Sequence, residues 1–316
     1  MELHTTRVRP GRVIHTAQAL VDAVAHVPQI PRRGGNVMAD DYSLHAAGAV
    51  NTLLAAARQG ATCVHAGAIG TGPNADLIRS TLAGAGVSIA GDPVPYLDSG
   101  ICFVMVEPGA ERTFVTTLGA ERLLDLEMLQ ASDPQPGDVV CVSGYSLAVE
   151  STRVPLLTWL SLLPDGVGVV LDPGAAFEEL PADIHDTMLS MTTVWTGNSE
   201  ETQSLTGERD MEVAAAAAAE RLSGESVVVV RDGALGCAVH ADGQTWVVPG
   251  FPQKPVDTNG AGDCHTGALI AARQHDLTWE ESCRRANAAA AIKITRRGPD
   301  TAPTAREVDR FLADWR

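Results

Sequence analysis

Short apolar runs rich in β-branched residues alternate along this chain with longer stretches rich in alanine and leucine. The apolar runs predict strands at residues 12–15, 62–67, 138–143, 167–172, 193–196 and 226–231. The longer stretches predict helices at residues 47–59, 74–85, 154–163, 211–223, 262–274 and 280–295. Because the strands are apolar throughout, both of their faces are expected to be buried. Alternation with helices is then typical of a parallel α/β sheet.

Two segments depart from this alternation. Residues 100–117 read as a β-hairpin in which Pro108 and Gly109 form the turn. Residues from about 22 to 45 form a second extended stretch that is interrupted by glycine and proline. Neither segment has the helix that completes a βαβ unit. We therefore expect insertions at about 22–45 and 99–118 to form a small accessory sheet, a lid over one edge of the main sheet.

Length and charge limit the class of protein. A chain of 316 residues without internal repeats or an evident linker is expected to form a single domain over residues 1–316. Lys and Arg number 23 against 39 Asp and Glu, and the formal net charge of −16 disfavours nucleic acid as a partner. No apolar run of about 18 residues is present, and the first residues lack the apolar core of a signal peptide. We therefore expect no membrane partner and a cytoplasmic location.

The cysteines support the same location. None of them has the CxxC spacing of a zinc ribbon or a thioredoxin motif. Most of them stand among apolar or small neighbours, and we expect buried free thiols, which are typical of a reducing compartment. The six positions are Cys63, Cys102, Cys141, Cys237, Cys264 and Cys283.

The segment 256–263, VDTNGAGD, precedes a helix of small residues and is the most informative segment about chemical function. Glycine at 260 and 262 lets a ligand approach the backbone closely. The amides of Gly260, Ala261 and Gly262 would lie at a helix N-terminus, where unpaired N–H groups and the helix dipole favour a phosphate. Asp263 beside them could accept the proton of an attacking hydroxyl. The plainer alternative is that Asp263 only caps the helix.

With this motif the chain resembles the ribokinase/PfkB family of carbohydrate and nucleoside kinases, whose C-terminal signature DTxGAGD matches residues 257–263. Three more family elements occur in the family's order: Asn-x-x-Glu at 198–201 before Leu-Thr-Gly, a glycine-bearing turn at 231–236, and Ala-Asn-Ala at 286–288. The resemblance covers almost the whole chain, more weakly in the N-terminal half. It implies a three-layer ribokinase-like α/β fold, with a mostly parallel central sheet flanked by helices and a small β-sheet lid.

The N-terminal half departs from the family in two places. Alanines at 46 and 47 stand where family members carry paired glycines. Leu20 stands where ribokinases proper tend to have a polar residue. The resemblance therefore does not single out ribose as the acceptor.

The resemblance implies a role for each matching position. Asp263 would be the general base, and the anion hole would be formed by the amides of Gly260, Ala261 and Gly262. The acceptor hydroxyls would be bound by Asp22, Gly34, Gly35 and Asn51. The nucleotide would be bound by Asn198, Glu201, Arg231, Gly233, Gly236 and Asn287. Mg²⁺ would be held, through water, by Asn198 and Glu201. A monovalent cation such as K⁺ would be held by Asp257 and Asn259.

Several of these residues also have a plainer structural interpretation. Asn198 and Glu201 have the spacing of a helix capping pair. Asp22 could be a turn residue at a strand end, and Gly233 and Gly236 ordinary turn glycines. His265 follows the predicted base, and we expect it to pack beneath the site rather than act as an acid or a metal ligand.

The sequence thus predicts an enzyme that moves the γ-phosphate of ATP, with Mg²⁺, to a hydroxyl of a small sugar or sugar-like acceptor. A nucleoside kinase of the same fold and a non-catalytic sugar or nucleotide sensor stay open. An aromatic content of 4% weighs against stacking of a base. A dinucleotide-dependent oxidoreductase is disfavoured because no GxGxxG follows the first strand. Apolar residues on both faces of the strand at 101–106 predict a homodimer through the lid.

Overall fold

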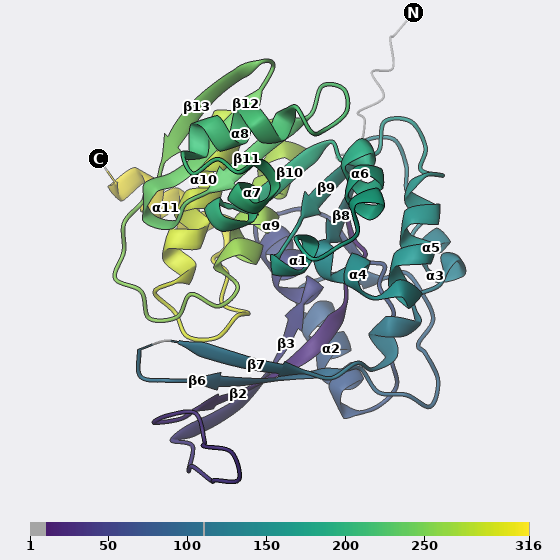
Figure 1. The fold of residues 1–316 in the computed structure, drawn as a ribbon, viewed down its shortest axis with the longest axis vertical. Helices are drawn as coiled ribbons and strands as arrows, with labels where there is room; N and C mark the ends of the chain where they lie inside the picture. Colours follow the sequence, from purple (N-terminus) through teal and green to yellow (C-terminus); the bar gives the residue numbers. More distant parts are fainter. Residues whose placement is uncertain (1–10, 110, 316) are drawn as a thin grey trace, which may run out of the picture.

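The computed structural model describes residues 11–109 and 111–315 and contains two sheets (Figure 1). The larger sheet has nine strands in the order β13-β12-β11-β10-β9-β8-β1-β4-β5. Their bounds are β1 (Val13–His15), β4 (Cys63–His65), β5 (Ser88–Ile89), β8 (Val139–Ser143), β9 (Gly168–Asp172), β10 (Val194–Asn198), β11 (Val227–Arg231), β12 (Gly236–Ala241) and β13 (Gln244–Pro249). All pairs from β5 to β11 are parallel, which confirms the predicted sheet.

The antiparallel end of this sheet was not predicted. β12 pairs antiparallel with both β11 and β13. The two-residue turn between β12 and β13 consists of Asp242 and Gly243, both with positive φ, at 52° and 71°. An Asp-Gly pair between apolar runs is a strong hairpin signal, because both turn positions need a left-handed backbone. The sequence therefore contained the signal for this hairpin.

Helices cover both faces of the larger sheet. The six predicted helices are present, with shifted ends, as α1 (Ala49–Arg58), α2 (Pro73–Gly84), α5 (Glu150–Leu160), α8 (Met211–Ala219), α9 (Ala261–Gln274) and α10 (Trp279–Lys293). The others are α3 (Leu126–Gln130), α4 (Gly144–Ala148), α6 (Ala182–Met191), α7 (Ser199–Thr206) and α11 (Ala305–Asp314), with short 3₁₀ turns at η1 (Ala120–Leu123), η2 (Ala175–Phe177) and η3 (Gly233–Leu235).

Successive strand residues point to opposite faces of the sheet and so pack in different parts of the core. Ile14 packs in a cluster with side chains of α3, α4, α5, α6 and α8. Its neighbour Val13 packs in a cluster with α1, α2 and α9. A third cluster joins β11 and β12 to α9, α10 and α11. The result is three layers, helices, sheet and helices, as the resemblance implies.

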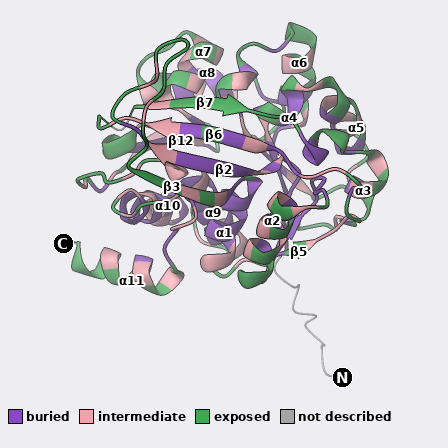
Figure 2. Cartoon of the chain, turned by 90° about the horizontal axis from the view of Figure 1, so that it is seen from below, coloured by how far each residue is buried: buried purple, intermediate pink, exposed green. Residues whose placement is uncertain are grey.

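The small sheet, β3-β2-β6-β7, lies apart from the larger one at the lower end of the molecule in Figure 1. It consists of β2 (Ala19–His26), β3 (Asp41–Gly48), β6 (Ile101–Val106) and β7 (Arg112–Thr116). The hairpin predicted over residues 100–117 is present as β6 and β7. The extended stretch predicted at 22–45 is instead two paired strands around a loop, and its second strand runs to Gly48. β2 is largely buried, whereas β7 at the sheet edge is largely exposed (Figure 2).

All six cysteines are free and buried, as predicted. Over residues 11–109 and 111–315, none of the helices has both the length and the apolar character that a membrane crossing requires.

Close packing of α9 on α1 depends on Gly267. A β-carbon at this position would lie 2.4 Å from the backbone oxygen of Thr52 and 2.7 Å from the β-carbon of Ala55. We expect Gly267→Ala to lower the free energy of unfolding by about 1–3 kcal/mol, because backbone must shift to admit the methyl group. Urea denaturation followed by circular dichroism measures this.

Gly84, in α2, provides the matched control, since a β-carbon there meets nothing within 4 Å. Gly84→Ala should leave stability unchanged or raise it by about 0.5–1 kcal/mol. Equal stabilities of the two variants would contradict the close-packing argument.

Candidate active site

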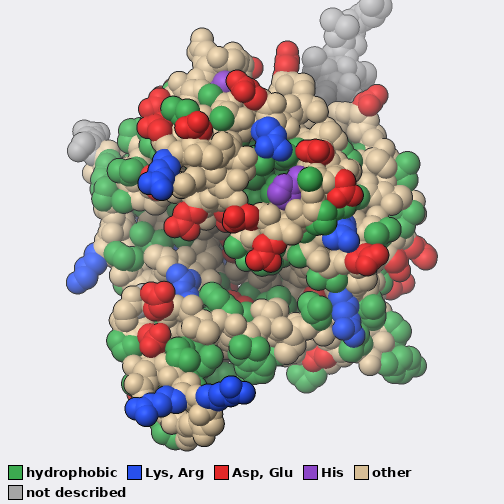
Figure 3. All heavy atoms as spheres, viewed as in Figure 1, with side chains coloured by type: hydrophobic (Ala, Val, Ile, Leu, Met, Phe, Trp, Pro, Cys, Tyr) green, Lys and Arg blue, Asp and Glu red, His purple; other side chains and the backbone are tan. Residues whose placement is uncertain are grey.

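A cavity of about 1150 Å³ lies between the small sheet and the carboxyl ends of the parallel strands. Its walls include Ser143, Asp172, Asn198 and Arg231, which stand at the ends of β8, β9, β10 and β11. Figure 3 shows the surface hollowed above the small sheet, with acidic side chains around the opening. The carboxyl ends of such strands are where ligands bind in open α/β sheets.

The predicted phosphate turn forms one wall of this cavity and starts α9. Gly260, the residue before the helix, has a φ of 72°, and a β-carbon there would lie 3.1 Å from the Pro299 oxygen. Gly260, Ala261, Gly262 and Asp263 all line the cavity. The Ala261 amide donates to the Thr258 oxygen at 3.2 Å, so this one of the three predicted amides has a partner within the chain.

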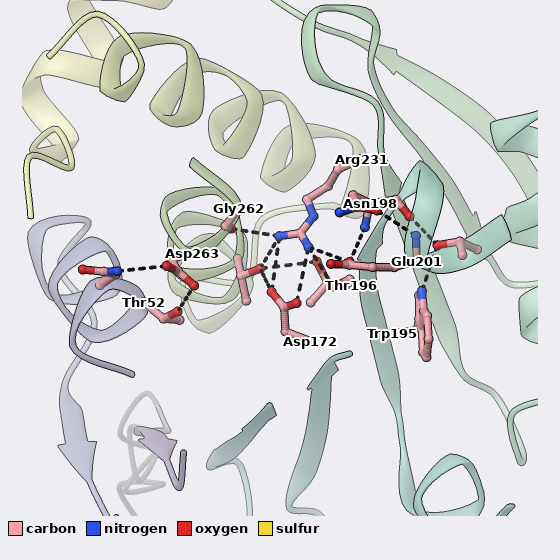
Figure 4. A network of polar contacts seen from close by, with 12 residues as sticks. Thr52, Asp172, Trp195, Thr196, Asn198, Glu201, Arg231, Gly262 and Asp263 are labelled. Atoms are coloured by element: carbon pink, nitrogen blue, oxygen red, sulfur yellow. Dashed lines mark hydrogen bonds and ion pairs between the residues drawn. The ribbon is translucent and has the colours of Figure 1, made fainter. Parts of the chain in front are cut away.

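Asp263 is held by two side chains of α1 (Figure 4). Asn51 Nδ2 donates to one carboxylate oxygen at 3.0 Å, and Thr52 Oγ1 donates to the other at 3.4 Å. Burial and the nearby charge of Asp172 raise the pKa of Asp263 to about 6, against the lowering effect of the Asn51 hydrogen bond. A carboxylate with this pKa is ionised at neutral pH and accepts a proton more readily than an ordinary aspartate.

Arg231, predicted to bind the nucleotide, lies in a network of contacts behind the turn (Figure 4). Its guanidinium donates to the Gly262 oxygen at 2.9 Å and forms ion pairs with Asp172 at 3.3 Å and Glu201 at 3.6 Å. Thr266 Oγ1 and the Thr196 oxygen accept further hydrogen bonds. Arg231 also lines the cavity, but two carboxylates already neutralise its charge. Arg231 contacts the turn through its hydrogen bond to the Gly262 oxygen.

Asn198 and Glu201 form the capping box that the plainer interpretation predicts. Asn198 Oδ1 accepts from the Glu201 amide and Glu201 Oε2 from the Asn198 amide, both at 2.8 Å. Both side chains also line the cavity. Burial and the Asp172 charge raise the pKa of Glu201. Within the described residues no three His, Cys, Asp or Glu side chains group around a metal position.

The residues predicted to bind the acceptor are only partly brought together. Asp22 faces the cavity from β2, and Asn259 Nδ2 donates to it at 3.4 Å. Burial raises the pKa of Asp22. Asn51 bonds to Asp263, as described above. Gly34 and Gly35 lie in the exposed loop between β2 and β3 and are not among the residues that line the cavity.

Gly233, Gly236 and Asn287 line another part of the cavity. Both glycines have positive φ, 52° and 102°. Asn287 Nδ2 donates to the Val248 and Pro249 oxygens, and its Oδ1 lies 3.0 Å from His265 Nε2. His265 is buried and held by this contact, in agreement with the packing role expected of it.

All three oxygens of Asp257 that could bind a cation accept hydrogen bonds from the chain. The Asn259 amide donates to Oδ1 at 2.8 Å and the Gly298 amide to Oδ2 at 2.9 Å. The Lys293 ammonium donates to the backbone oxygen at 3.1 Å.

Sequence reasoning missed several residues of the site. Asp172 ends a strand that was predicted at 167–172, and an acid at the end of a buried strand was an available signal. Lys293 was also detectable, as a lysine within the apolar run Ala-Ala-Ile-Lys-Ile. Arg112, on β7 of the small sheet, reaches the turn and donates to Thr258 Oγ1. Thr52 carried no recognisable signal, because its role depends on how α1 packs on α9.

Comparison with known proteins places these features in a family. Residues 12–305 match the family described as pfkB family carbohydrate kinase. The chain is 28% identical over 309 residues to the uncharacterized sugar kinase YegV of Escherichia coli, covering 94% of this chain and 92% of the relative. It is also 28% identical over 306 residues to the ribokinase of Haemophilus influenzae, covering 92% and 95% of the two chains.

Solved structures agree on the fold. The ribokinase of Arabidopsis thaliana, solved in complex with ribose and ATP, superposes with a TM-score of 0.77 at 21% identity, over 96% of this chain and 98% of that one. The predicted ribokinase-like fold is thus confirmed. Together with the family match over nearly all of its length, this means that the chain belongs to the pfkB family of carbohydrate kinases.

Proposed function

We propose that this protein transfers the γ-phosphate of ATP to a hydroxyl of a small sugar or sugar-like acceptor. Asp263 acts as the general base, and the backbone of Gly260–Gly262 provides the anion hole. The observation that carries the proposal is the place of Asp263: a carboxylate with a raised pKa at the first turn of α9, on the wall of a cavity that Asp22 and the predicted nucleotide residues also line.

Two observations favour a sugar as acceptor. The relatives described above are named a sugar kinase and a ribokinase. Asp22 and Asn259 present a carboxylate and an amide next to each other on the cavity wall, and a carboxylate accepts hydrogen bonds from two hydroxyls at once. A nucleoside is the second candidate, because Phe114 lines the same cavity and offers an aromatic face to a base.

In the proposed reaction the chain mainly positions the reactants. The phosphates of ATP lie against the first turn of α9, where the helix dipole and the unpaired amides attract negative charge. Asn198 and Glu201 would hold Mg²⁺ through water, and the ion would neutralise charge on the phosphates. Asp263 accepts the proton of the acceptor hydroxyl as the hydroxyl oxygen bonds to the γ-phosphorus in line, and the bond from that phosphorus to the bridging oxygen breaks so that ADP leaves. Asn51 and Thr52 keep that carboxylate oriented during the attack.

The small sheet acts in this proposal as a lid. It supplies Asp22, Cys102, Phe114 and Thr116 to the cavity wall, and Arg112 joins it to the turn through Thr258. Such a cover keeps water from competing with the acceptor for the phosphoryl group.

The kinase and the sensor differ in one measurable property, the release of ADP. A coupled assay across a panel of sugars, sugar acids and nucleosides should show acceptor-dependent ADP production. We expect Asp263→Asn and Asp263→Ala to lower kcat by at least about 100-fold, as is usual for the loss of a general base. Asp165→Asn, at an exposed acid, is the matched control. Binding without ADP release would support the sensor, and near-normal turnover in Asp263→Ala would exclude this residue as the base.

The raised pKa of Asp263 predicts how kcat/KM falls at low pH. Since the base acts only when ionised, kcat/KM should fall as the pH drops below about 6, in measurements at saturating ATP. The Asn51 hydrogen bond lowers this pKa, so Asn51→Ala should move the fall to higher pH. An acid limb that stays in place in Asn51→Ala would show that another group titrates.

We also infer a homodimer through the outer face of the small sheet. Leu44 on β3, Phe103 on β6 and Val115 on β7 lie in one row across the four strands, with the buried Ala23 of β2 between Leu44 and Phe103, and are 45%, 46% and 55% exposed. An apolar row of this kind is typical of an interface between copies of a chain.

Light scattering should therefore give twice the mass of one chain, and Phe103→Glu should give monomers. Leu162→Glu, at an apolar residue that is 62% exposed elsewhere, is the control and should leave the dimer intact. A monomeric mass for the unaltered protein at working concentration would refute the dimer.

A further inference from the structure

Lys293 is a charged side chain in a place that usually excludes charge. It is the last residue of α10 and is completely buried. The chain has only one other lysine, Lys254, which is exposed. Removing an ammonium from water costs several kcal/mol unless partners compensate for the lost hydration. The neighbours of Lys293 therefore show what its charge does.

Those neighbours belong to the phosphate turn. The ammonium donates to the backbone oxygen of Asp257 at 3.1 Å. Burial lowers the pKa of Lys293, while the charges of Asp257 and Asp263 raise it. The end of α10 holds the same segment by its backbone, because the Ile294 oxygen accepts from the amides of Val256 at 2.7 Å and Asp257 at 3.1 Å. Lys293 thus places a positive charge next to the backbone at Asp257, in the segment that precedes the anion hole.

A monovalent cation, which the family resemblance implies at Asp257 and Asn259, does not fit at Asp257. A cation needs oxygen atoms whose lone pairs face it. Both carboxylate oxygens of Asp257 accept from backbone amides, and its carbonyl oxygen accepts from the ammonium. A second positive charge beside a buried ammonium would also be repelled strongly at this low effective dielectric.

We propose that the Lys293 ammonium takes the place of the monovalent cation, so that phosphoryl transfer by this protein needs no K⁺. Lys293 is a positioning residue. It fixes the Asp257 carbonyl, and through it the turn 257–263, and it adds a fixed positive charge on the side of the anion hole away from the substrate. The catalytic part of this inference rests on the proposed phosphoryl transfer, whereas the exclusion of the cation does not.

The first test uses the unaltered protein. At constant ionic strength, replacing tetramethylammonium chloride by KCl up to 100 mM, about physiological strength, should change kcat by less than about twofold. RbCl should not raise the melting temperature beyond the tetramethylammonium control, and crystals grown with RbCl should show no Rb⁺ anomalous peak at Asp257. Stimulation by K⁺ of about fivefold or more, or an Rb⁺ peak at Asp257, would overturn the proposal.

The second test removes the charge and keeps the length of the side chain. We expect Lys293→Met to lower kcat by about tenfold or more while KM for ATP changes less than about threefold, since the charge acts on the transferring group. Lys254→Met, the same change at the exposed lysine, is the control for the loss of one positive charge. A folded Lys293→Met variant with kcat within twofold of the unaltered protein would contradict the role of the ammonium.

The two tests separate the possible failures. If no acceptor releases ADP, the proposed function fails, yet the melting and Rb⁺ measurements still decide whether Lys293 excludes a cation. If Lys293→Met does not fold, the response of the unaltered protein to K⁺ and Rb⁺ decides the question alone.

Discussion

The contact between α9 and α1 determines the geometry of the whole site. α9 carries Asp263 from the C-terminal part of the chain, and α1 carries the Asn51 and Thr52 side chains that orient it. Gly267 lets the two helix backbones approach until a β-carbon would overlap the Thr52 oxygen. Because α1 directly follows β3, the same contact fixes the base relative to the small sheet and to Asp22 on β2. The contact between these two helices thus fixes the side of the cavity proposed for ATP relative to the side proposed for the sugar.

Charge is distributed unevenly around this contact. The protein carries a net charge of −16, and some of its acidic groups lie on the cavity wall. These are the carboxylates of Asp22, Asp172, Glu201 and Asp263. A polyphosphate could not approach these groups without compensation. Arg231, on the wall, pairs with Asp172 and Glu201 and donates to the Gly262 carbonyl, while Lys293, buried away from the cavity, donates to the Asp257 carbonyl. Two cationic side chains thus hold backbone oxygens of the segment 257–262 and leave the amides of Gly260 and Gly262 for an anionic ligand.

Residue type and periodicity were enough to predict the parallel strands, the main helices and the turn at 257–263. What they missed depends on three-dimensional contact. Gly34 and Gly35 were predicted to bind the acceptor because of their place in the sequence. The paired strands β2 and β3 end at His26 and Asp41, and the loop that joins them lies outside the cavity lining. Lys293 and Asp257 are 36 residues apart, and only the packing of α10 against the turn brings them together. The capping box at Asn198 shows the opposite case, in which one pair of side chains serves the helix and the cavity at once.

The raised pKa of Asp263 has a thermodynamic consequence for the fold. Its pKa rises from 3.8 to about 6, so the ionised carboxylate is less stable in the folded protein than in the unfolded chain. At pH 7 the group is ionised in both states, and the folded state carries the full cost. As the pH falls from about 6 towards 4, the folded state takes up the proton first and this cost disappears. The fold therefore gives up stability at neutral pH at the residue proposed as the base, and the Asn51 hydrogen bond across the α9–α1 contact and the charge of Arg231 are the interactions that reduce this cost.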